Sequence, residues 1–173
     1  MLPIPTHLRD ILQVDEARFD GHNMDGGIKC TCGCDDIRLK IYGEEHPEHI
    51  AVKRYKGNYG FRIVGTCAGC EKDFEIFDMA KHGYNGFVCH DGMPVEDADL
   101  IVFSCGACQG ESFAVDIGIE LEDKDQFIEE VVEDEPDKFA PEDYVDAFDW
   151  FTVALKCRKC GRKLEGWVDF ETS

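Results

Sequence analysis

The chain of 173 residues is long enough for one or two domains with a substantial core. Hydrophobic residues make up 43% and charged residues 32%, a globular composition that excludes collagen, coiled coils and disordered linkers. Eighteen Lys and Arg stand against 37 Asp and Glu, and the resulting net charge of -19 makes binding to a nucleic-acid backbone unfavourable.

The sequence contains no segment that predicts a membrane span. The longest apolar runs, such as Trp150 to Leu155, have the length of a strand and fall far short of the roughly 18 residues that a span requires. Pro3, Pro5 and His7 occupy the region where a signal peptide needs a basic stretch followed by an apolar one. We therefore expect a cytoplasmic protein without membrane association.

Residues 1–27 are predicted to form an N-terminal extension. The spacing of apolar residues between Pro5 and Phe19 favours a short helix, with Thr6 as a candidate N-cap. The segment from Asn23 to Gly27 is typical of a turn. We expect this extension to pack against the module that follows it.

The cysteines carry the clearest chemical signal. Nine of the ten fall in four tight clusters, which in a reducing cytosol indicate metal binding in place of disulfides. Each C-x-x-C turn directs two thiolates into one concavity, and two such turns complete a shell of four sulfurs. Pairing in chain order predicts one site from the first two clusters and another from the last two. The clusters are Cys30-Thr-Cys32-Gly-Cys34, Cys67-Ala-Gly-Cys70, Cys105-Gly-Ala-Cys108 and Cys157-Arg-Lys-Cys160, and Cys89 stands alone.

Apolar residues at every second position predict strands next to each cluster. One strand leaves the first cluster at Ile37 and another leaves the third at Phe113, each five positions after a cysteine. Further strands lead into the second and fourth clusters and leave them again. The two halves of the chain therefore look like a duplication of one unit.

This order of cysteine turn, strand, strand, cysteine turn and strand resembles the zinc-ribbon or rubredoxin-like class over residues 28–78 and 101–170. The resemblance implies a strand-rich α+β fold of two small antiparallel β modules with short helices packed on them. In the first cluster both Cys30 and Cys34 lie two positions from Cys32; aligning Cys32 with Cys108 favours Cys30, with Cys34 as the alternative. The implied metal ligands are Cys30, Cys32, Cys67, Cys70, Cys105, Cys108, Cys157 and Cys160.

The predicted domain plan follows from these positions. The first zinc-ribbon module covers residues 28–78, a linker covers 79–99, and the second module covers 100–173. The second module contains an insert, residues 120–149, with 14 acidic and two basic residues. Apolar spacing and the position of Pro141 predict two short amphipathic helices in this insert, packed on the ribbon. They form a solvated cover, a docking surface for a basic protein partner, or a crude mimic of nucleic acid.

Four thiolates without histidine describe a closed structural zinc site. We therefore expect two structural zinc ions and a non-catalytic protein that acts as an acidic adaptor or regulatory protein-interaction module. No phosphate-binding loop or zincin helix is present, and Cys89 beside His90 favours an unreactive loop cysteine. Two alternatives stay open: a rubredoxin-like electron-transfer protein with iron in place of zinc, and a zinc-ribbon protein of the transcription or translation machinery.

Overall fold

Antiparallel strands dominate the computed structural model, which describes all residues from 1 to 173 and confirms a strand-rich fold with few helices. None of its helical elements has the length or apolar character needed to cross a membrane. The strands are β1 (Leu12–Val14), β2 (Asn23–Ile28), β3 (Ile37–Tyr42), β4 (Glu44–Glu45), β5 (Ile50–Ala51), β6 (Lys53–Tyr55), β7 (Asn58–Gly60), β8 (Arg62–Cys67), β9 (Asp73–Asp78), β10 (Ile101–Val102), β11 (Phe113–Glu120), β12 (Trp150–Cys157) and β13 (Lys163–Glu171). The helical elements are η1 (Thr6–Leu8), η2 (Tyr84–Val88), η3 (Asp97–Asp99), α1 (Lys124–Phe127), η4 (Ile128–Val132) and η5 (Pro141–Val145).

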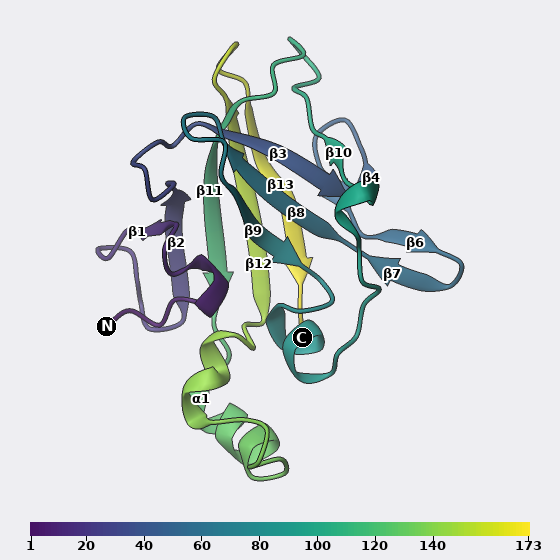
Figure 1. Ribbon diagram of the computed structural model, residues 1–173. Helices are drawn as coiled ribbons and strands as arrows, with labels where there is room; N and C mark the ends of the chain where they lie inside the picture. The colour runs from purple at the N-terminus through teal and green to yellow at the C-terminus, as the bar shows by residue number, and fades with distance from the viewer.

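Nine strands form one antiparallel sheet that curls back on itself (Figure 1). It contains two three-stranded meanders, β3-β8-β9 and β11-β12-β13. The meanders meet where Ile37 of β3 pairs with Phe113 of β11. Strand β2 also pairs with β11 and with β1, and β10 pairs with β3. The hairpins β4-β5 and β6-β7 lie outside this sheet.

The two meanders hold their cysteines in the same register. Ile37 lies opposite Cys67 in the first meander, and Phe113 lies opposite Cys157 in the second. Each meander also has a register shift just before this cysteine, where the outer strand bulges. The shifts follow Ile63 and Val153, each four residues before its cysteine.

One hydrophobic cluster of 28 buried residues takes side chains from both meanders. Phe77 of β9 stacks on Phe151 of β12, with ring centroids 4.7 Å apart. Trp167 of β13 is 1% exposed and lies against Phe103, with ring centroids 4.8 Å apart. A three-stranded sheet must bury its apolar face against another element, and here each meander covers the other. The two predicted modules thus share a core in place of having one each.

The N-terminal extension has less helix than the sequence predicts. Its helical part is the single 3-10 turn η1, and Leu12–Val14 form strand β1. The segment from Asn23 to Gly27, predicted as a turn, belongs to strand β2 between β1 and β11. A Cβ on Gly26 would lie 2.5 Å from the carbonyl oxygen of Gln13, so glycine here permits the close approach of β1.

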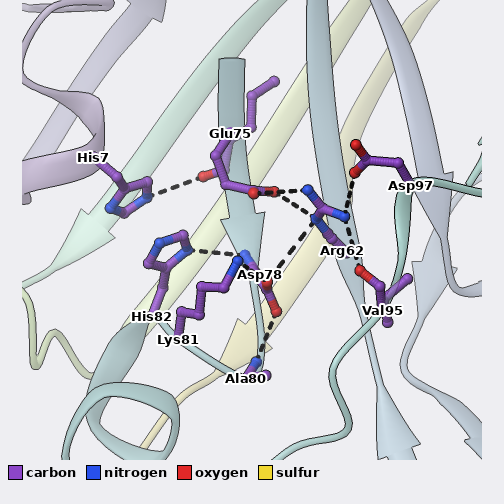
Figure 2. A network of polar contacts seen from close by, with 10 residues as sticks. His7, Arg62, Glu75, Asp78, Ala80, Lys81, His82, Val95 and Asp97 are labelled. Atoms are coloured by element: carbon purple, nitrogen blue, oxygen red, sulfur yellow. Dashed lines mark hydrogen bonds and ion pairs between the residues drawn. The ribbon is translucent and has the colours of Figure 1, made fainter. Parts of the chain in front are cut away.

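The segment predicted as a linker, residues 79–99, is bound to the first meander. Arg62 of β8 donates to the Asp97 carboxylate at 2.7 Å and binds Glu75 through Nε and Nη2, both at 3.0 Å (Figure 2). Nearer the start of the segment, His82 stacks on His7 of η1 with ring centroids 3.6 Å apart. These contacts hold both the linker and the N-terminal turn against the sheet.

The acidic insert lies beyond the ends of β11 and β12 (Figure 1). In it α1 continues into η4, and η5 begins at Pro141, in agreement with two short helical segments. Their apolar side chains form a second, smaller cluster in place of covering the ribbon face, and Tyr144 also contacts the main core. The cluster consists of Phe127, Val131, Phe139 and Ala147, and Tyr84, Phe87 and Val88 of η2 pack against it.

Candidate metal centres

Four sulfur atoms converge at each of two places in the structure, and within each group they lie within 4.8 Å of one another. The closest sulfur pairs are 3.6 Å apart in the first group and 3.6 and 3.7 Å apart in the second. Zn–S bonds of about 2.3 Å in a tetrahedron place the sulfurs about 3.8 Å apart, whereas a disulfide requires about 2.05 Å. Each group can therefore hold a metal ion. The groups are Cys30, Cys32, Cys67 and Cys70, and Cys105, Cys108, Cys157 and Cys160.

Each pair of neighbouring cysteines lies on a turn closed by a backbone hydrogen bond. In the three C-x-x-C turns the N–H of the first cysteine donates to the carbonyl oxygen five residues later. The C-x-C turn is one residue shorter, and Cys30 donates to the carbonyl oxygen of Cys34 at 2.8 Å. The shorter turn thus closes in the same way as the others. The longer turns pair Cys67 with Lys72 (3.0 Å), Cys105 with Gly110 (2.7 Å) and Cys157 with Arg162 (2.8 Å).

A residue in the left-handed conformation follows the second cysteine of every turn. Two of these residues are glycines, Gly33 with φ 91° and Gly161 with φ 76°. The other two, Glu71 with φ 63° and Gln109 with φ 58°, have side chains and adopt this conformation at a steric cost. The same backbone path therefore occurs at all four clusters, whether the left-handed residue is a glycine or carries a side chain.

Backbone N–H groups within the turns stabilise thiolates. Gly69 N–H lies 3.3 Å from Cys67 Sγ, and donation from the N–H groups of Cys70 and Gly69 lowers the pKa of Cys67 to about 6. At Cys157 burial opposes ionisation, but two N–H groups of its own turn outweigh it and lower the pKa to about 7. Each group thus contains a cysteine that readily binds a cation as thiolate near neutral pH.

Cys34 lies outside the first sulfur group, and its Sγ accepts the N–H of Asp36 at 3.4 Å. In the shorter turn it takes the place that Gly110 has in the third turn. A Cβ added to Gly69 would lie 3.2 Å from the Cβ of Cys34, and one added to Gly110 would lie 3.0 Å from the Cβ of Lys159. A glycine on one side of each contact therefore lets the facing turns approach without displacing a neighbour. The structure groups Cys30 with Cys32 and leaves Cys34 as an additional thiol.

Polar contacts connect the surroundings of the two groups, and the sequence contains no local signal for them. The Ser112 hydroxyl donates to Oδ1 of Asp36, 76 positions away in the chain. Arg158 binds both the backbone carbonyl oxygen and the carboxylate of Asp35, each at 3.0 Å. Lys159 donates to the carbonyl oxygen of Cys108 at 3.1 Å. The basic residues of the fourth cluster are thus engaged within the protein.

Cys89 is isolated from both groups. Loss of some solvent around the thiol and the nearby Asp91 carboxylate raise its pKa, although the residue is exposed. A reactive cysteine needs the opposite shift, because the thiolate is the nucleophile.

Comparison with known proteins adds no guide to function, because the chain matches no protein-family model, no curated protein and no solved structure. The features that point to a function are therefore the two sulfur groups and the distribution of surface charge.

Proposed function

We propose that the protein is a non-catalytic zinc-binding adaptor or regulatory module whose fold is stabilised by two structural four-cysteine zinc sites. The pair of closed four-sulfur groups, each with two buried cysteines, carries this proposal. Four thiolates fill the tetrahedral shell of Zn(II) and leave no position for a substrate or an activated water. Free thiols at all ten cysteines are compatible with a reducing, cytoplasmic location.

The correspondence between the halves supports two copies of one zinc-ribbon-like unit. Both meanders share the register of strand and cysteine, the position of the register shift and the left-handed residue after the second cysteine. Because backbone geometry recurs while side chains differ, we infer that the metal sites impose the common path.

The metal content tests the first half of the proposal. Native mass spectrometry and elemental analysis of protein purified without added metal should give two zinc ions per chain. Cys30→Ser and Cys105→Ser should each lose one ion, whereas Cys34→Ser and Cys89→Ser should keep both. Iron in these sites would favour rubredoxin-like electron transfer, and loss of zinc from Cys34→Ser alone would assign the ligand differently.

Surface charge supports a basic protein partner. Two zinc ions bring four positive charges and eight thiolates bring eight negative ones, so the net charge of -19 becomes about -23. The acidic insert concentrates this charge at the end of the sheet, and a field of this kind favours association with a basic surface.

A labelled lysine-rich peptide, octalysine, provides a direct test of this surface. Neutralising Glu129, Glu133, Asp134 and Asp137 to their amides should weaken binding by about ten-fold at low salt. These residues are exposed and form no side-chain ion pair. A matched control neutralises Asp10, Glu16, Glu96 and Glu165, which are also exposed. Equal weakening in both variants would mean that the insert is not the docking surface.

A further inference from the structure

The hairpin β6-β7 is a basic and aromatic projection on an acidic protein (Figure 1). No acidic residue occurs between Glu48 and Glu71, although acidic residues are twice as common as basic ones in the whole chain. Every residue from 53 to 59 is exposed. The hairpin presents three cations, Lys53, Arg54 and Lys56, and two tyrosines, Tyr55 and Tyr59.

The cations of the hairpin have no acidic partner in the protein. Eleven ion pairs occur in the structure, and none includes Lys53, Arg54 or Lys56. Each instead lies over a tyrosine ring, at 4.9 to 5.7 Å from the ring centroid. Tyr55 and Tyr59 are 52% and 49% exposed. The hairpin therefore offers both charge and aromatic surface to a ligand.

One backbone edge of the hairpin is also open. Arg54 pairs with Tyr59, whose carbonyl oxygen accepts the N–H of Met93 at 2.7 Å on the outer side. Arg54 and Tyr59 therefore form a non-hydrogen-bonded pair, in which the N–H and C=O groups of both residues point away from the partner strand. The backbone groups of Arg54 thus face outward along β6. No strand besides β7 pairs with β6. A third strand would supply hydrogen bonds that a two-stranded hairpin lacks.

We propose that the hairpin β6-β7 binds an extended acidic segment of a protein partner, which adds as a third strand along β6. Carboxylates of the segment pair with the three cations, backbone groups pair at Arg54, and the exposed tyrosines provide apolar contact area. This site goes beyond the proposed adaptor function, because it is a second surface whose charge is opposite to that of the acidic insert.

The same features favour a polypeptide over a single-stranded nucleic acid. The register places Tyr59 beside Arg54 on one face, and Tyr55, as the next residue along the strand, on the other. The two rings therefore do not form one platform on which successive bases stack.

Fluorescence anisotropy tests the proposal on the metal-loaded full chain, with a labelled decapeptide in which pairs of glutamates alternate with pairs of threonines. Such a strand presents carboxylates on both of its faces, as the cations of β6 require. The variant K53Q/R54Q/K56Q should bind this probe about ten-fold more weakly than the wild type. The control K29Q/K156Q/K163Q removes the same charge from exposed lysines without ion pairs and should bind within about two-fold of the wild type. Circular dichroism and zinc content establish that both variants are folded.

A second pair of variants tests the added strand. Arg54→Pro removes an outward-facing N–H that β7 does not use, whereas Arg54→Gln removes only the charge. Arg54→Pro should therefore bind the peptide several-fold more weakly than Arg54→Gln. The proposal is overturned if the wild type fails to bind the peptide, if the two triple variants bind equally, or if Arg54→Pro equals Arg54→Gln. Tighter binding of a ten-nucleotide oligothymidine would also overturn it in favour of a nucleic-acid ligand.

Discussion

Glu122 is a buried carboxylate where the acidic insert leaves the sheet. It is 8% exposed, and burial together with the nearby charge of Asp149 raises its pKa to about 7. The N–H of Asp123 donates to Oε1 of Glu122 at 2.9 Å, which lowers the pKa but offsets only part of the increase. The pKa of an unperturbed glutamate is 4.5, so the folded state retains this proton at a higher pH than the unfolded state does. Its contribution to stability is therefore complete below about pH 4.5 and is lost as the pH rises through 7.

Replacing the Glu122 carboxylate by a neutral isostere should remove this loss of stability at high pH. We expect Glu122→Gln to raise the free energy of unfolding at pH 8 by about 1 kcal/mol relative to wild type, and by less at pH 6. Urea denaturation of the zinc-loaded proteins at both pH values measures the difference. Glu120→Gln changes an exposed carboxylate and is the control. A difference between Glu122→Gln and wild type that is constant with pH contradicts the assignment.

Residues differ in how far the sequence predicts their environment. The grouping of the cysteines could be predicted because metal-binding chemistry restricts thiols to a few spacings. The buried position of Glu122 could not, because the insert contains 14 acidic residues and packing alone determines which one is buried.

Each cysteine turn contains one residue in the left-handed backbone conformation. Gln109 is exposed and adopts φ 58°, and Gly161 adopts φ 76° at the matching position of the fourth turn. A Cβ on Gly161 would meet no atom within 4 Å, so the cost of a side chain there is purely conformational.

Opposite substitutions at these two positions should therefore have opposite effects. Gln109→Gly should stabilise the metal-loaded protein by about 0.5 to 1 kcal/mol, and Gly161→Ala should destabilise it by about 1 kcal/mol. Thermal unfolding with saturating zinc measures both. If both substitutions shift the midpoint in the same direction, backbone conformation is not what distinguishes the turns.

Among the elements, the meander strands could be predicted and β2 could not. Strand β3 alternates buried and partly exposed residues along its whole length, which is the pattern that predicted it. In β2 the glycines hide this pattern. The need for glycine at position 26 comes from the close approach of β1, which is not visible in the local sequence.

The whole molecule is organised around one core, although its two sulfur groups are separate. The cluster of 28 buried residues joins both meanders, and the insert has only a small cluster of its own. The sequence predicted each meander but not their contact, because the pair of Ile37 and Phe113 joins strands that are distant in the chain. A local periodicity cannot specify such a pairing.

A shared core should make the two halves unfold together. Cys105→Ser, which disrupts only the second sulfur group, should lower the melting temperature by roughly 10 °C or more. It should also increase amide hydrogen exchange at Ile63 and Val64 of β8 in the first meander. Cys89→Ser, at an isolated and exposed cysteine, should change neither quantity. Unchanged exchange in β8 would mean that the meanders unfold independently.

The acidic insert is also the connection between β11 and β12, the two eight-residue strands that lead to the second sulfur group. A partner that pulls on the insert applies tension to both strands at one end. At the other end the Sγ atoms of Cys108 and Cys157 lie 3.6 Å apart, and a metal ion bound there would connect the two strands. The hydrogen bonds between the strands would separate first, and the metal–thiolate bonds at the opposite end of the sheet would be the last connection between β11 and β12.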